Sequence, residues 1–152
     1  MNYWLVKTEP SEFSIDDFLK APKKTEPWNG IRNYQARNFM RDKMKKGDLV
    51  FIYHSNCKQI GIVGLSAVAK EAYPDPLALD PKSKYYDPKS TPDNNRWVMV
   101  DLKFVEKFNQ VISLATLKTI PALAGMQLLA KGNRLSVLPI KAKEFKTIMR
   151  LV

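Results

Sequence analysis

Two apolar segments joined by a short polar turn decide the fold: "DLVFIYHS" (48–55) and "QIGIVGLSAVAKEA" (59–72). Apolar side chains occupy both alternating faces of the first segment, which predicts a strand covered on both sides. The tight turn between the segments predicts that they pair. Gly61 and Gly64 in the second segment predict bends or a bulge, as a small closed barrel requires. The two segments therefore predict the centre of a curved sheet.

Further segments with strand character lie on either side of this pair. They are "YWLVK" (3–7), "RWVMVDLKFVEKF" (96–108) and "RLSVLPI" (134–140). The first is closed by Pro10, because a residue that precedes proline is driven toward extended geometry. The predicted sheet is therefore built from segments spread over the whole chain.

Apolar spacing and capping residues predict helices at 14–20, 33–44, 113–120 and 141–152, with part of 121–132 also helical. The segments 21–27 and 73–95 are predicted loops. The second of these is long and carries five prolines, which is typical of a binding loop or lid, or of a disordered segment. The length of 152 residues and the absence of a linker predict one α+β domain over 1–152.

The charge of the chain points to a polyanionic partner. Lys and Arg number 25 against 15 Asp and Glu, a net charge of +10. Such a balance favours nucleic acid or an anionic surface, although basic surfaces also serve solubility. No apolar run approaches the ~20 residues of a membrane span, so we expect no membrane partner. The single cysteine cannot form an internal disulfide, which predicts a reducing compartment such as the cytoplasm.

The only histidine and the only cysteine, His54 and Cys57, stand three positions apart. A nucleophilic pair needs a third group to orient the base, and a zinc site needs four ligands. Neither pattern is present, so we expect no catalytic residue, no metal and no cofactor. If the chain were an enzyme, Glu9 and His54 would be its best acid–base candidates.

Aromatic and polar residues gather at predicted loop positions. An unstacked base needs an aromatic face to stack on and hydrogen-bonding groups along its edge. Trp28 lies between Pro27 and Asn29 in a predicted loop, so we expect it to stack on a base. Trp4 and Trp97 lie in predicted strands, and we expect them in the core.

Together, these segments resemble an EVE domain, a family of the PUA-like superfamily that is related to YTH domains. The stretches that carry the resemblance are "YWLVKTEPSEFSIDDF" (3–18), "WNGIRNYQARNFMR" (28–41), "GDLVFIYHSNC" (47–57), "IGIVGLSAV" (60–68), "EAYPDPLALDPKSKYYDP" (71–88) and "RLSVLPI" (134–140). The resemblance implies a PUA-like mixed β-barrel of about five or six strands flanked by helices. It also implies a non-enzymatic reader that holds a modified base of DNA or RNA in an aromatic pocket.

Carried onto this chain, the resemblance and the aromatic pattern give a candidate base pocket of Lys7, Thr8, Glu9, Trp28, Gly30, Asn33, Tyr34, His54, Ser55, Asn56, Tyr85, Tyr86, Arg134 and Ser136. The second aromatic wall stays open between Tyr34, Tyr85 and Tyr86. We expect Arg32, Arg37 and Arg41 to contact phosphates. A small-molecule or nucleotide-binding module and an RNA-processing enzyme are the alternative functions. We expect a monomer.

Overall fold

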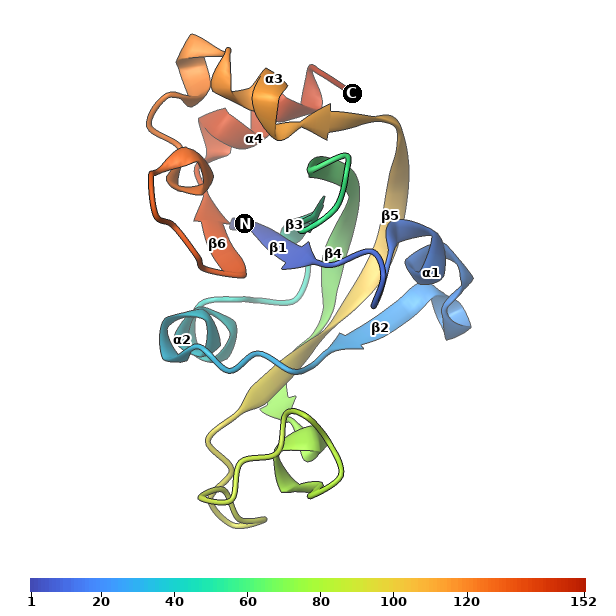
Figure 1. The fold of residues 1–152 in the computed structure, drawn as a ribbon, viewed down its shortest axis with the longest axis vertical. Helices are drawn as coiled ribbons and strands as arrows, with labels where there is room; N and C mark the ends of the chain where they lie inside the picture. Colours follow the sequence, from blue (N-terminus) through green and yellow to red (C-terminus); the bar gives the residue numbers. More distant parts are fainter.

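The computed structural model describes residues 1–152 and has a mixed sheet of six strands flanked by helices (Figure 1). The strands are β1 (Tyr3–Thr8), β2 (Thr25–Trp28), β3 (Leu49–His54), β4 (Gly61–Pro74), β5 (Val98–Ser113) and β6 (Val137–Ile140). Their order in the sheet is β2-β5-β4-β3-β1-β6. Only β1 and β3 run parallel to each other. The predicted α+β class and strand number are confirmed, but the edge strands β2 and β6 do not pair with each other, so the barrel is not closed.

Four α-helices flank the sheet: α1 (Ile15–Lys20), α2 (Tyr34–Asp42), α3 (Leu114–Lys118) and α4 (Ala142–Met149). The predicted start of α1 is confirmed by a capping box, in which the Ser14 side chain accepts from the Asp17 amide and the Asp17 side chain accepts from the Ser14 amide. Asn33 caps α2, which ends at Asp42, earlier than predicted.

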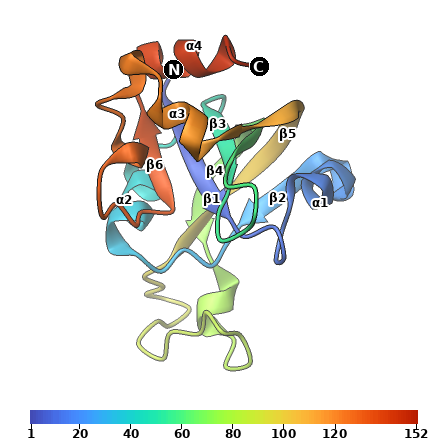
Figure 2. The same cartoon turned by 45° about the horizontal axis from the view of Figure 1, so that its top comes forward.

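The sheet is covered on both faces, as the apolar filling of β3 predicts. On β3, Val50 and Ile52 belong to a cluster that includes side chains of α1 and α2. Phe51 and Tyr53 belong to a second cluster that includes side chains of α3 and α4. In Figure 1, α3 and α4 lie together at one end of the molecule, away from α1 and α2, and Figure 2 shows α4 at this same end.

The irregularity predicted at Gly61 and Gly64 is confirmed. The pairing of β4 with β5 shifts register between Ile62 and Gly64. A side chain at Gly64 would place its Cβ 2.6 Å from the carbonyl oxygen of Glu106. The close approach of the two backbones therefore requires glycine.

Two predicted boundaries are wrong. The predicted loop 21–27 contains most of β2, whose Pro27 pairs with Asp101 of β5. A proline is tolerated there because β2 is an edge strand. The predicted strand 96–108 begins only at Val98 and continues to Ser113, so Trp97 lies outside it although it is buried.

Residues 75–97, between β4 and β5, form a long excursion that projects from the end opposite α3 and α4 (Figure 1). It begins with a 3-10 turn, Pro76–Leu79, capped by the Asp75 side chain. The excursion covers most of the predicted loop 73–95. None of the helices is long and apolar enough to span a membrane.

Candidate functional site

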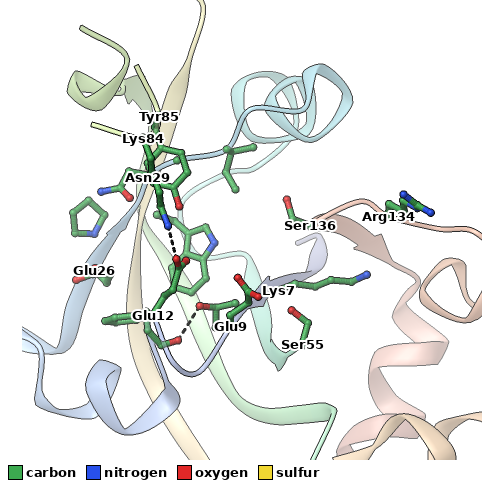
Figure 3. A pocket seen from close by; sticks show the side chains of 16 residues that line it. Lys7, Glu9, Glu12, Glu26, Asn29, Ser55, Lys84, Tyr85, Arg134 and Ser136 are labelled. Carbon is green, nitrogen blue, oxygen red and sulfur yellow. Dashed lines mark hydrogen bonds and ion pairs between the residues drawn. The ribbon is translucent and has the colours of Figure 1, made fainter. Parts of the chain in front are cut away.

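A cavity of about 640 Å³ lies where the ends of β1 and β2 meet the excursion and the segment that leads into β6. We call it the strand-end pocket. Figure 3 shows Lys7, Ser55, Arg134 and Ser136 on one side and Asn29, Lys84 and Tyr85 on the other. The predicted pocket residues that line it are Lys7, Thr8, Glu9, Trp28, Gly30, Ser55, Tyr85, Arg134 and Ser136.

Trp28 is the pocket residue most deeply tied to the core. It ends β2 and is 7% exposed, so the prediction that Trp28 lies in a loop is wrong. Its ring meets Phe13 edge-on at a centroid distance of 5.8 Å and Phe18 of α1 at 6.2 Å. Trp28 therefore lines the pocket mainly as an extension of the hydrophobic core.

Tyr85 forms the opposite aromatic wall and reaches the pocket from the excursion. Its ring lies against the backbone of Gly30, where an added Cβ would stand 2.7 Å from Tyr85 Cζ. Gly30 also has a φ of +77°, which favours glycine. The guanidinium of Arg32 lies 5.5 Å from the centre of the Tyr85 ring, and Arg32 Nε donates to the Tyr85 carbonyl. Among the three tyrosines left open by the sequence, only Tyr85 lines this pocket.

Asp75 is fully buried and holds the tyrosine wall in place. Its Oδ2 accepts from the Gly30 amide at 2.9 Å and from Arg32 Nη1 at 3.1 Å. Its backbone carbonyl accepts from the Asn95 side chain. A buried carboxylate is tolerated when it is paired and hydrogen-bonded in this way. Asp75 therefore ties both ends of the excursion to the segment that follows β2.

Ionisable groups of both signs line the pocket. The three acids are Glu9, Glu12 and Glu26, and the three bases are Lys7, Lys84 and Arg134. Glu12 and Lys84 form an ion pair across the pocket (Figure 3). Because the signs balance, the lining offers hydrogen-bonding groups rather than a strong net charge.

Burial shifts two of these groups toward their neutral forms. It raises the pKa of the Glu26 carboxyl and lowers the pKa of the Lys7 ammonium. Neither side chain has a hydrogen-bond or ion-pair partner within the chain, unlike Glu9, which accepts from Asn56. Glu26 shares a face of β2 with Trp28, since side chains alternate along a strand. Glu26 and Lys7 therefore keep free hydrogen-bonding capacity inside the pocket.

A family model described as "EVE domain" matches residues 2–151 of the chain. The chain belongs to the EVE domain family. Rat thymocyte nuclear protein 1 is 46% identical over 167 residues, which cover 99% of this chain and 73% of that protein. A crystal structure of a Pseudomonas syringae protein superposes with a TM-score of 0.93 at 47% identity, covering 98% of each chain.

A second similar structure holds a ligand. It is human THYN1 protein in complex with 5-methylcytosine-containing DNA. It superposes on this EVE domain with a TM-score of 0.93 at 42% identity, covering 99% of this chain and 97% of the human one. The PUA-like fold expected from the resemblance is thereby confirmed.

Three predicted pocket residues of this EVE domain support neighbouring structure instead of lining the pocket. Asn33 caps α2 through its side chain. His54 faces a different cavity and accepts at Nε2 from the Ile15 amide at the start of α1, at 3.1 Å. Asn56 has a φ of +52° and donates its amide to Glu9. Of these three side chains, only that of Asn56 hydrogen-bonds to a residue that lines the pocket, Glu9.

Tyr34 and Tyr86 lie beyond the strand-end pocket, on the far side of Tyr85. Both line a separate shallow cavity together with Trp97. Tyr34 stacks on Trp97 with a centroid distance of 4.8 Å and an interplanar angle of 27°. The structure therefore divides the predicted aromatic residues between two adjacent cavities.

The three predicted phosphate contacts differ in availability. The Arg32 guanidinium is engaged by Asp75. Arg37 of α2 donates to the Arg96 carbonyl and to Asn38. Arg41 pairs only with its exposed neighbour Asp42. Arg32 is thus a structural cation, Arg37 is half-buried against the excursion, and Arg41 is exposed.

Sequence reasoning missed several pocket residues: Glu12, Phe13, Glu26, Pro27, Asn29, Ile31 and Lys84. They fall within the stretches that carry the EVE resemblance or between them. The resemblance therefore covers the region in which they lie, but it did not identify them as pocket residues. Asp75 was also missed, because its partners Gly30 and Arg32 are 45 and 43 residues away in the sequence. Its place between Pro74 and Pro76 marked a turn but gave no sign of the partners.

Proposed function

We propose that this EVE domain is a non-enzymatic reader of a modified base in nucleic acid, held in the strand-end pocket. The main support for this proposal is an open pocket walled by Tyr85 and Trp28. The chain that forms it is similar to a human protein whose structure is a complex with 5-methylcytosine-containing DNA. An aromatic wall offers stacking to an unpaired base, and polar groups around it offer contacts to the base edge.

Within this proposal, Tyr85 provides the main stacking surface, because it is partly exposed whereas Trp28 is mostly covered. Glu26 and Asn29 lie on the same side of the pocket as Tyr85 (Figure 3). A carboxylate accepts a hydrogen bond from the exocyclic amine of cytosine, which thymine lacks. The free carboxyl of Glu26 therefore suits a base that carries an amino group, such as 5-methylcytosine.

Phosphate attraction comes mostly from outside the pocket, since the signs inside it balance. The whole chain carries +10, so a nucleic acid strand is drawn to the surface around the pocket. We propose Arg37 and Arg41 of α2 as phosphate contacts, which position the strand without reading its sequence.

Two alternatives are less well supported. For an RNA-processing enzyme, Glu9 and His54 would have to act on one substrate, but they line different cavities. For a small-molecule module, an enclosed cavity would be expected, whereas this pocket is open to solvent. The proposed location stays a reducing compartment such as the cytoplasm, because Cys57 is a free thiol, although the curated vertebrate relatives carry the word nuclear in their name.

The test is a titration of the protein with matched oligonucleotides that carry cytosine, 5-methylcytosine or thymine at one position, at one salt concentration. We expect the tightest binding to the methylated strand and the weakest to the thymine strand. Glu26→Gln should narrow the preference for cytosine bases over thymine. Equal affinity for all three strands would reject the reader function.

A further inference from the structure

A second cavity, of about 430 Å³, adjoins the strand-end pocket across the Tyr85 side chain. Lys84 and Tyr85 line both cavities. Tyr34 from the start of α2 and Tyr86 and Trp97 from the excursion also line it. We call the surface formed by Tyr34, Tyr86 and Trp97 the tyrosine platform.

Two rings of the platform are unusually exposed for aromatic side chains. Tyr34 is 50% exposed and Tyr86 is 41% exposed, whereas Trp97, on which Tyr34 stacks, is buried. The Trp97 indole is fixed by a hydrogen bond from Nε1 to Asp87 at 2.9 Å. Tyr34 is in turn held by its stacking on Trp97 and by Arg37, whose Cζ lies 4.7 Å from the Tyr34 ring centre. Tyr34 is thus a pre-positioned ring with half of its surface in solvent.

Unpaired cations surround the platform. Lys89 and Arg96 line its cavity and take part in none of the ion pairs in the structure. The one acid there, Asp87, is already occupied by Ser90, Trp97 and the Lys89 amide. Exposed aromatic rings beside free cations are the combination that binds single nucleotides of a strand, by stacking on the base and attracting the phosphate.

We propose that the tyrosine platform binds the nucleotide that flanks the base held in the strand-end pocket. This inference rests on the proposed function. The flanking base stacks on the exposed part of Tyr34, and its phosphate lies near Lys89 and Arg96. The shared wall of Tyr85 and Lys84 lets one strand contact both cavities in succession. The platform thereby adds affinity for an unpaired flanking base without regard to its sequence.

The experiment compares two methylated oligonucleotides of equal length and charge. One carries a base beside the modified nucleotide, and the other carries an abasic site on each flank. Tyr34→Ala should weaken binding of the first strand about 5- to 150-fold and leave binding of the second unchanged. Tyr34→Phe is the matched control, because it keeps the stacking ring and should bind both strands like the wild type.

Two results would overturn the platform. In one, Tyr34→Ala binds both strands as tightly as the wild type does. In the other, Tyr34→Ala lowers the affinity for both strands by the same factor, which would mean that Tyr34 only supports the structure of the excursion. Thermal unfolding of both variants provides the folding control. If the strands show the Tyr34 effect but methylated and unmethylated bases bind equally, the reader function fails while the platform stands.

Discussion

The two aromatic walls of the strand-end pocket are held by different means. Trp28 ends a sheet strand and packs on Phe13 and Phe18 in the hydrophobic core. Tyr85 lies in the excursion and is held by polar contacts that converge on Asp75. A wall built from the core cannot be removed without a cost in stability, whereas a wall carried by a loop can be changed almost independently of the fold. We therefore expect substitutions at the two walls to separate stability from binding.

The largest effect is expected at the core wall. Trp28→Ala removes a large side chain that is 7% exposed and should lower the free energy of unfolding by about 3–5 kcal/mol. Chemical denaturation monitored by circular dichroism measures this loss. Trp28→Phe keeps part of the packing and should lose less. A Trp28→Ala variant as stable as the wild type would show that the core does not depend on this wall.

Asp75→Ala should have the next largest effect, because it leaves Arg32 and the Gly30 amide without their common acceptor. Loss of one partner of a buried ion pair costs about 3–5 kcal/mol, and partial exposure of Arg32 places this case near the lower end. Urea unfolding measures the stability, and limited proteolysis reports release of the excursion. Asp93→Ala, which removes an exposed acid without side-chain partners in the same excursion, should change neither. If both variants behave alike, the excursion is held by other contacts.

Tyr85→Ala should lower binding more than stability. Stacking on an aromatic ring contributes roughly 1–3 kcal/mol per base, so affinity for a methylated oligonucleotide should fall about 5- to 150-fold. The free energy of unfolding should change little, because the ring is partly exposed and outside both core clusters. Tyr85→Phe should bind normally. Titrations paired with unfolding curves make the comparison with Trp28→Ala direct, and equal losses of stability in the two alanine variants would contradict it.

The sequence predicted the position of the pocket better than the structure of either wall. β1, β3, β4 and β5 follow from apolar periodicity, because a buried strand needs apolar side chains on both faces. β2 was missed because the segment 21–27, with two prolines and two lysines, shows no such pattern, and an edge strand needs none. The EVE resemblance located the pocket, since the ends of β1 and β2 fall within its motifs. It could not choose Tyr85 over Tyr34, because that depends on where the excursion folds back.

The smallest expected effect is the pH dependence of stability, which should involve the support of the Trp28 wall but not that of the Tyr85 wall. His54 Nε2 accepts from the amide of Ile15 in α1, which also carries Phe18, a contact of Trp28. Burial lowers the pKa of His54 below its ordinary value of 6.5, although Asp16 opposes this shift. Protonation at Nε2 would remove the acceptor and place a charge beside Lys58 and Lys107, which line the same cavity. The core wall therefore has a titrating support, whereas none of the hydrogen bonds that hold the other wall through Asp75 involves the histidine.

The folded protein binds fewer protons than the unfolded chain at pH values below about 6.5, so this contribution to the free energy of unfolding is present above that pH and is lost as the pH falls. His54→Gln can keep a neutral acceptor for the Ile15 amide and should flatten the pH dependence of the free energy of unfolding. At low pH, we expect the free energies of unfolding of the variant and the wild type to differ by on the order of 1 kcal/mol. Urea unfolding of both proteins from about pH 8 to 5 measures this difference. The carboxylates that the two proteins share contribute equally to both curves, so their titration drops out of the comparison. Tyr85→Phe should follow the wild-type profile throughout. Parallel profiles for wild type and His54→Gln would mean that α1 is held by packing alone.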